Sequence, residues 1–252
     1  MYHLEAGVGF GRLPLEFPHM AAEHLFSRPA MAAKARPDDD WSPSSHSTCT
    51  AGKAVGVWHG ASKKATLVIV KLVSMLAYEM ISALERIIDD IQAKPERQKR
   101  SVITLSIGYE MPQGDSLIFH DMRERIQTLM DMDVPFVASA GNHRIDLGKE
   151  FVHLAPAVFA GPDYPMIVVG STDTAGKRSD FSQGGPKVVV HACGEHPTCF
   201  DKEGNILQSW KGTSFGKLLS LVFPCSDNFS HLFSIAPPNK QTNQTKPPKI
   251  LA

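Results

Sequence analysis

Three residues with the chemistry of acyl transfer lie far apart in this chain: a histidine, an asparagine and a serine. Ser214 follows Gly212 and Thr213, and a serine hydroxyl becomes a nucleophile when a neighbouring base removes its proton. His46 offers an imidazole base, and the amide of Asn142 offers N–H donors for an oxyanion. Each is ordinary when taken alone, since Gly-Thr-Ser often begins a helix, Gly-Asn is a common turn pair and most lone histidines are structural. Their order and local settings together indicate an active site.

The settings of these residues fit such a site. A run of small residues at 47–52 follows His46, so a tightly packed helix beginning at the histidine would hold the imidazole rigidly. Asn142 comes after an apolar segment, where its amide can face a cleft. Gly212 lets a substrate backbone approach Ser214 closely. If Ser214 begins a helix, its own backbone N–H faces the developing oxyanion.

Alternating elements must bring these residues together. Short apolar runs at 67–72, 102–107, 136–140, 166–169 and 188–190 predict strands that are covered on both faces. Apolar residues at three- and four-residue intervals predict helices across 80–91 and 119–130. This alternation predicts an α/β fold: a parallel β-sheet with helices on both faces. Because reactive groups gather at the carboxyl ends of parallel strands, residues 106–108 and 138–142 are expected beside the site.

Composition narrows the class of protein. The chain has 252 residues, of which 42% are hydrophobic and 21% charged, and 26 basic residues balance 26 acidic ones. Nothing therefore indicates a nucleic acid partner. No apolar run reaches the roughly 18 residues of a membrane span, and no signal peptide precedes the first segment. The four cysteines lack paired metal-ligand spacing, so Cys193 and Cys199 are either a short disulfide or free buried thiols.

Several segments resemble the subtilisin-like serine proteases, also called subtilases or peptidase S8 proteins, and they occur in that family's order. The segments are His46-Ser47-Thr48, Ser106-Ile107-Gly108, Ala138-Ser139-Ala140-Gly141-Asn142, residues 166–182 and Gly212-Thr213-Ser214-Phe215. Residues 49–54 are similar to secreted fungal members. The resemblance covers residues 1–216, which we expect to form a partial peptidase domain. It implies a monomeric extracellular endopeptidase that acts on protein or peptide substrates without a cofactor. Calcium sites are common in the family, but no ligand cluster here indicates one, so no metal is expected.

The resemblance also implies roles for individual residues. Ser214 attacks the peptide bond, His46 carries the proton, and Asn142 together with the Ser214 N–H stabilises the oxyanion. Glu5 is the acid that orients His46. An extended substrate is expected to lie along two stretches, formed by Ser106, Ile107 and Gly108 and by Ala138, Ser139, Ala140 and Gly141.

Two departures from the family pattern favour an alternative. The position of the triad aspartate falls at Glu5, whose side chain is one methylene longer. Asp38, Asp39 and Asp40 are acidic alternatives, but they lie in a loop too close to His46 in sequence to match the family pattern. After Phe215 the chain continues as Gly216-Lys217 in place of the family's Ala-Ala-Pro, so residues 217–252 are expected to form a divergent, poorly ordered tail. The chain then looks incomplete at both ends. The alternative is an impaired or inactive homologue that only binds peptides.

Overall fold

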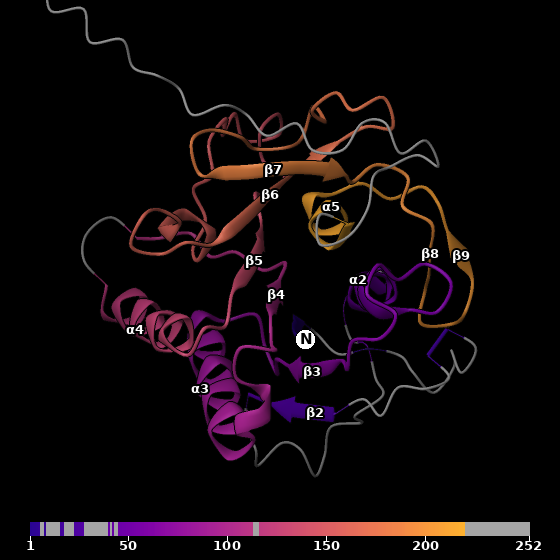
Figure 1. The fold of residues 1–252 in the computed structure, drawn as a ribbon. Helices are drawn as coiled ribbons and strands as arrows, with labels where there is room; N and C mark the ends of the chain where they lie inside the picture. The colour runs from indigo at the N-terminus through magenta and orange to yellow at the C-terminus, as the bar shows by residue number, and fades with distance from the viewer. Residues whose placement is uncertain are drawn as a thin grey trace, which may run out of the picture.

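A seven-stranded parallel sheet forms the centre of the molecule (Figure 1). The computed structural model describes residues 1–5, 8, 16–17, 23–27, 40, 42, 45–112 and 116–219. The strands, in the spatial order β2-β3-β1-β4-β5-β6-β7, are β1 (Tyr2–Glu5), β2 (Glu23–Phe26), β3 (Val68–Lys71), β4 (Ile103–Leu105), β5 (Phe136–Ser139), β6 (Ile167–Thr172) and β7 (Val188–Cys193). The predicted α/β fold with a parallel sheet is confirmed.

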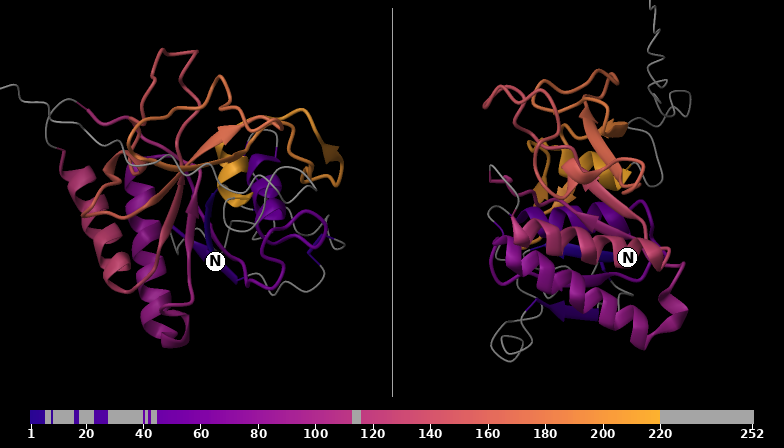
Figure 2. Two further views of the ribbon diagram at one scale, coloured as in Figure 1. Left: turned by 45° about the horizontal axis from the view of Figure 1, so that its top comes forward. Right: turned by 90° about the vertical axis from the view of Figure 1, so that its left-hand side faces the viewer.

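Helices cover both faces of the sheet. Helices α3 (Ala77–Ala93) and α4 (Leu117–Asp131) lie side by side on one face, as both views in Figure 2 show. Helices α2 (His46–Val55) and α5 (Thr213–Leu219) pack against each other on the opposite face. The central strands β1, β3 and β4 are buried along their whole length, which explains the almost continuous apolar sequences of β3 and β4. Strand β1 is equally buried but contains the polar residues His3 and Glu5.

The larger core lies between the sheet and helices α3 and α4. Helix α3 contributes the apolar stripe that its sequence predicts, and the residues of this stripe are Met80, Leu84, Ile87, Ile88 and Ile91. They pack against Leu4, Val68 and Val70 of the sheet. Burying each large aliphatic side chain contributes roughly 1.5–3 kcal/mol, so this layer anchors the sheet beneath the site.

The strand order reverses beside β1. Strands β3 and β2 lie on one side of it, and β4 to β7 lie on the other. Crevices open at such switch points, outside the carboxyl ends of the strands. Glu5 ends β1 and Ser106 follows the end of β4, so both residues lie at the carboxyl edge of the sheet beside this switch point.

Some features differ from the sequence-based expectation. Strand β2 and the two-stranded antiparallel hairpin of β8 (Cys199–Phe200) and β9 (Ile206–Leu207) were not predicted, because each is too short for a clear periodicity. Two short 3₁₀ turns, η3 (Pro95–Arg97) and η4 (Ala157–Phe159), complete the described elements.

The cysteine pairing also differs from the one considered above. Cys199 forms a disulfide with Cys49 of α2, so a Cys193–Cys199 bridge is wrong. Cys193 ends β7 within the sheet, whereas the following chain carries Cys199 across to α2. Cys193 belongs to a different disulfide.

The end of the described chain bears on the predicted tail. Helix α5 continues to Leu219, and the side chain of Lys217 within it is fully buried. Residues 220–252 lie outside the described residues, so the poorly ordered tail stays a prediction. Within the described part of the chain, no helix has the length and apolar character needed to cross a membrane.

Candidate active site

Glu5 and His46 meet where the end of β1 faces the start of α2. The Nδ1 atom of His46 lies 3.5 Å from Oε1 of Glu5, which makes an ion pair longer than a well-formed hydrogen bond. The Glu5 side chain is 2% exposed, whereas that of His46 is 27% exposed. The other carboxylate oxygen of Glu5 accepts a hydrogen bond from the Ser47 hydroxyl at 3.3 Å. Burial opposes ionisation of Glu5, but the positive charge of His46 and its contact outweigh burial and lower the pKa of Glu5 to about 2.

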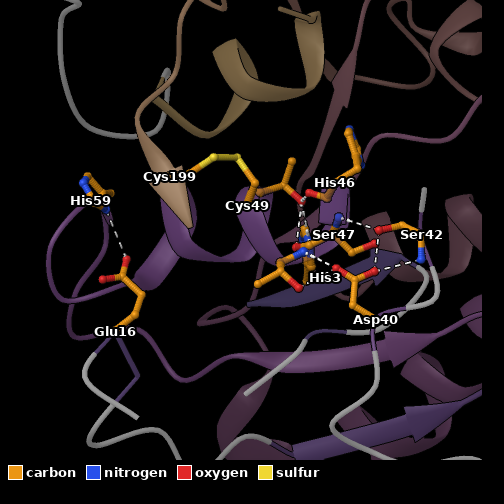
Figure 3. The surroundings of a disulfide bond; sticks show 11 residues. His3, Glu16, Asp40, Ser42, His46, Ser47, Cys49, His59 and Cys199 are labelled. Carbon is orange, nitrogen blue, oxygen red and sulfur yellow. Dashed lines mark hydrogen bonds and ion pairs between the residues drawn. A yellow bond between two sulfur atoms is a disulfide. The ribbon is translucent and has the colours of Figure 1, made fainter. Parts of the chain in front are cut away.

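Asp40 lies at the beginning of α2 and has a different role from that of Glu5. Its carboxylate accepts hydrogen bonds from the Thr48 N–H at 2.8 Å and from the Ser42 N–H at 2.9 Å, and also from both hydroxyls of these residues (Figure 3). The Ser42 hydroxyl oxygen in turn accepts a bond from the Ser47 N–H. Asp40 therefore accepts the Thr48 N–H in the first turn of the helix that carries His46, and it holds Ser42, which accepts the Ser47 N–H. Asp38 and Asp39 lie outside the described residues.

Ser214 is the second residue of α5, as its Gly-Thr-Ser context predicts. Its residue surface is 6% exposed, and the next residue, Phe215, is buried. The ring of Phe215 lies against the imidazole of His46, with 5.6 Å between the centroids. The packing of α2 on α5 thus brings the histidine and the serine to the same place in the fold.

Asn142 is held by the residue before Ser214. Its Oδ1 accepts hydrogen bonds from the backbone N–H of Thr213 at 2.9 Å and from the Thr213 hydroxyl at 3.0 Å. These bonds leave the Nδ2 group of the exposed Asn142 as its donor, beside Gly212. Gly141 has a φ of +103°, and a Cβ there would lie 2.1 Å from Oε1 of Gln183, so glycine is required before the asparagine.

The two expected substrate stretches lie on adjacent strands. Leu105 pairs with Ala138, so Ser106, Ile107 and Gly108 leave β4 beside the end of β5. In the second stretch Ala138 is a core residue, and the Ala140 N–H donates to the Val169 carbonyl at 2.9 Å. The Gly141 N–H donates to the Thr213 hydroxyl at 3.2 Å. Much of the second stretch is thus bonded within the molecule, and Ser139 is its half-buried member.

Two buried basic residues near the site were missed from the sequence. His3 precedes Glu5 by two residues on β1 and lies between the hydroxyls of Thr104 and Thr50, at 3.0 and 3.2 Å. Burial, with the positive charges of Lys217 and His46, lowers the pKa of His3 to about 4. Lys217 lies one helical turn after Ser214 and is 0% exposed; burial lowers its pKa to about 7, against the opposing charge of Glu5. Neither had a signal in the sequence, because no local pattern predicted a buried position at residue 3, and residue 217 was assigned to the tail.

Potential metal ligands cluster elsewhere. Among the described residues, one group of three, His120, Asp121 and Glu124, has ligand atoms within 4.8 Å of one another. All three are exposed on α4, on the face of the sheet opposite to α2 and α5. This group has no part in the site of His46 and Ser214.

The chain is similar in sequence to known proteins. The sequence model of the family described as "Subtilase family" matches residues 21–216. Alkaline protease 1 of Aspergillus flavus is 28% identical over 172 residues, which are 67% of this chain and 36% of that protein. A subtilisin-like protease of Coccidioides posadasii is 27% identical over 174 residues, covering 67% of this chain and 37% of its own length. The chain thus spans little more than a third of the length of the curated relatives it matches.

Solved structures share the fold. A cold-adapted subtilisin-like serine proteinase has a TM-score of 0.65 and 21% identity, covering 87% of this chain and 71% of its own. MycP1 without its N-terminal propeptide has a TM-score of 0.65 and 20% identity, and the match covers 88% of this chain and 75% of the MycP1 chain. The prenylagaramide maturation protease PagA has a TM-score of 0.63 and 22% identity, and the match covers 86% of this chain and 70% of the PagA chain. At these identities the likeness concerns the fold.

Proposed function

The chain belongs to the subtilase family, and from this premise we propose that it is a serine endopeptidase with Ser214 as nucleophile, His46 as base and Glu5 as the acid of the triad. The observation that carries the proposal is the setting of His46. Its Nδ1 faces the buried carboxylate of Glu5, and its ring packs on the residue next to Ser214. Because Nδ1 is turned to Glu5, Nε2 is the nitrogen left to take the serine proton.

The reaction follows from these positions. As the Ser214 hydroxyl oxygen attacks the carbonyl carbon of the substrate, its proton passes to Nε2 of His46. Glu5, held ionised by its low pKa, stabilises the imidazolium that forms. The imidazolium then gives the proton to the leaving amine, which leaves an acyl group on Ser214. Water, activated by the same imidazole, releases the carboxylic acid product.

Asn142 stabilises the charge that develops in each step. The bonds from Thr213 to Oδ1 fix the amide, so Nδ2 can donate to the oxyanion together with the Ser214 N–H. Backbone groups of Ser106, Ile107 and Gly108 would align an extended peptide. The substrate is therefore a protein or peptide strand, and the enzyme needs no cofactor and no second subunit for this chemistry. The Cys49–Cys199 disulfide and the fungal relatives favour action outside the cell.

A fluorophosphonate probe tests the proposal, because it reacts covalently with an activated serine. We expect the probe to modify Ser214, as mapped by mass spectrometry of tryptic peptides, and we expect Ser214→Ala and His46→Ala to abolish the modification. Asn142→Ala should slow hydrolysis of a chromogenic peptide by about 100-fold or more, the loss typical of one oxyanion donor. Modification of a different serine, or equal labelling of Ser214→Ala, would refute the assignment.

A second candidate function is peptide binding without turnover. The observation that favours it is the 3.5 Å contact between Glu5 and His46, which is long for a catalytic hydrogen bond. In that case a peptide would bind to both the native chain and Ser214→Ala with equal affinity, and neither protein would react with the probe. Calorimetric titration with a substrate peptide, run beside the labelling experiment, separates the two functions.

A further inference from the structure

One covalent link joins the helix of His46 to the segment that leads to Ser214. The disulfide between Cys49 and Cys199 spans 150 residues of sequence, from α2 to β8 (Figure 3). Cys49 lies three residues after His46, so the two side chains share one side of α2. Both sulfur-bearing residues are 0% exposed.

The disulfide packs on the residue that follows the nucleophile. Cys49, Cys199 and Phe215 form a separate buried cluster, with the half-buried Leu207 and Trp210 against it. The Trp210 and Phe215 rings meet edge to face, with 5.9 Å between centroids. Phe215 also contacts the ring of His46. The cluster is therefore continuous from the disulfide, through Phe215, to both His46 and Ser214.

The β8–β9 hairpin has other attachments of its own, so the disulfide is not needed to hold it. The Asp201 carboxylate accepts bonds from the backbone N–H groups of Glu203 and Asn205, which fixes the turn between the strands. At the base of the hairpin the His196 N–H donates to the Trp210 carbonyl at 2.9 Å. The Lys202 ammonium also donates to the Asp40 carbonyl at 3.1 Å. What the disulfide adds is a fixed position of this hairpin on α2.

We propose that the Cys49–Cys199 disulfide positions the catalytic base against the nucleophile: it clamps α2 onto the Phe215 cluster and so sets the approach of His46 to Ser214. This inference rests on the proposed endopeptidase function. Cys49 and Cys199 are positioning residues, because neither touches the reacting atoms. Small displacements of a base from its nucleophile cost up to about 100-fold in rate, so the clamp acts on the chemical step rather than on substrate binding.

A double-mutant cycle tests the clamp. Hydrolysis of a chromogenic peptide and the rate of fluorophosphonate labelling are measured for the wild type, Cys49→Ala, Cys199→Ala and the double variant, at a temperature where circular dichroism shows all four folded. We expect each of the three variants to lose kcat by the same 10- to 100-fold, because either single change already opens the link, while KM stays within about two-fold. A two-dimensional NMR cross-peak between the His46 and Phe215 rings should be present in the wild type and weaken in all three variants.

A second measurement needs no variant. Wild-type protein is treated with dithiothreitol in urea below its unfolding transition; the reductant supplies two electrons and two protons to the disulfide and becomes a cyclic disulfide itself. Alkylation and mass spectrometry give the fraction in which Cys49 and Cys199 are reduced. We expect the labelling rate to fall in proportion to that fraction.

The outcomes separate this inference from the proposed function. If the wild type labels at Ser214 and the variants or the reduced protein label equally fast, the clamp is refuted while the endopeptidase stands. The same holds if the variants only melt at a lower temperature with kcat unchanged, because the disulfide is then a stabilising link alone. A wild type that does not label overturns both. An equal loss of kcat in all three variants, with the ring cross-peak weakened, supports the clamp.

Discussion

At the scale of single residues, the acid partner of His46 is the most unusual group in the site. Glu5 is ionised throughout the pH range of the folded protein, because its pKa of about 2 lies below any ordinary working pH. It is therefore a fixed negative charge beneath the imidazole. Its two oxygens divide between His46 and Ser47, so the carboxylate contacts two residues of α2.

Replacing Glu5 tests whether this charge is used. Glu5→Gln keeps the length of the side chain but removes the charge that stabilises the imidazolium, so we expect the labelling rate at Ser214 to fall by at least about 100-fold. Peptide affinity, measured by calorimetry in the Ser214→Ala background, should not change. Glu203→Gln, an exposed substitution, is the matched control. A Glu5→Gln rate within two-fold of wild type would remove Glu5 from the triad.

Lys217 gives a second prediction at this scale, and it concerns stability. Its folded pKa of about 7 lies below the 10.5 of a free lysine, so between these values the unfolded chain holds a proton that the folded chain has released. Wild-type stability should therefore rise as the pH rises from 7 towards 10. Lys217→Met removes the cost of burying the charge, so we expect its Tm to exceed the wild-type value at pH 6–7, on the order of 5 °C.

The pH dependence is the decisive measurement for Lys217→Met. The Tm advantage should shrink by pH 10, as followed by scanning calorimetry across this range. Lys177→Met, at an exposed position, serves as the control and should show no such trend. A lower Tm for Lys217→Met at pH 7 would show that contacts of the ammonium group outweigh its desolvation.

At the scale of elements, the start of α2 decides where the base lies. The helix begins at His46 itself, so its first turn carries both the imidazole and several N–H groups that lack helical partners. Asp40, from an earlier part of the chain, accepts the N–H of Thr48, and Ser42, which is bonded to Asp40, accepts the N–H of Ser47. The position of the histidine thus depends on an aspartate whose bonds go to the start of the helix rather than to the imidazole.

Removing this acceptor should loosen α2. Asp40→Ala leaves the buried donors of Ser42 and Thr48 without their carboxylate, so we expect the free energy of unfolding to fall by about 2–4 kcal/mol. Urea denaturation followed by circular dichroism gives this value, with Asp163→Ala as an exposed control. A change below about 0.5 kcal/mol would contradict the capping role.

At the scale of the whole molecule, the charges buried beside the sheet couple stability to pH. His3 stays neutral until the pH falls to about 4, whereas a histidine in the unfolded chain takes up a proton near 6.5. Within this window the unfolded chain holds more protons, so stability must fall as the pH is lowered. His59, His153 and His191 have pKa values lowered by burial in the same direction and add to the slope.

A substitution at His3 isolates its share of this slope. His3→Gln retains polar atoms for Thr50 and Thr104 but cannot titrate, so its unfolding free energy should decline less steeply between pH 6.5 and 4 than that of the wild type. Urea denaturation at half-unit pH steps measures both slopes. Replacement of the exposed His120 should leave the wild-type slope unchanged. Equal slopes for His3→Gln and wild type would mean that His3 titrates normally in the folded protein.

The sequence by itself predicted the strands β3 to β7 and the helices α3 and α4. It also named His46, Asn142 and Ser214 as candidate site residues from their order along the chain. The strands and helices could be predicted because a run of apolar residues, or an apolar stripe at helical spacing, lies entirely within one segment of the sequence. Glu5 was also named from the sequence, although only as a residue at the family's acid position. Its role and those of His46, Asn142 and Ser214 in catalysis stay predictions until the labelling experiments are done.

Only the tertiary structure decided which distant residues meet. In the structure Cys49 is bonded to Cys199, and Asp40 is a hydrogen-bond acceptor at the start of α2 rather than an acid of the triad. His3 and Lys217 are buried beside Glu5. The short strands β2, β8 and β9 likewise exist through their neighbours rather than through their own sequence. The physical reason is that these contacts join different segments of the chain, from Asp40 and Thr48, which are eight positions apart, to Cys49 and Cys199, which are 150 apart. Their energy depends on packing between segments, which no local periodicity records.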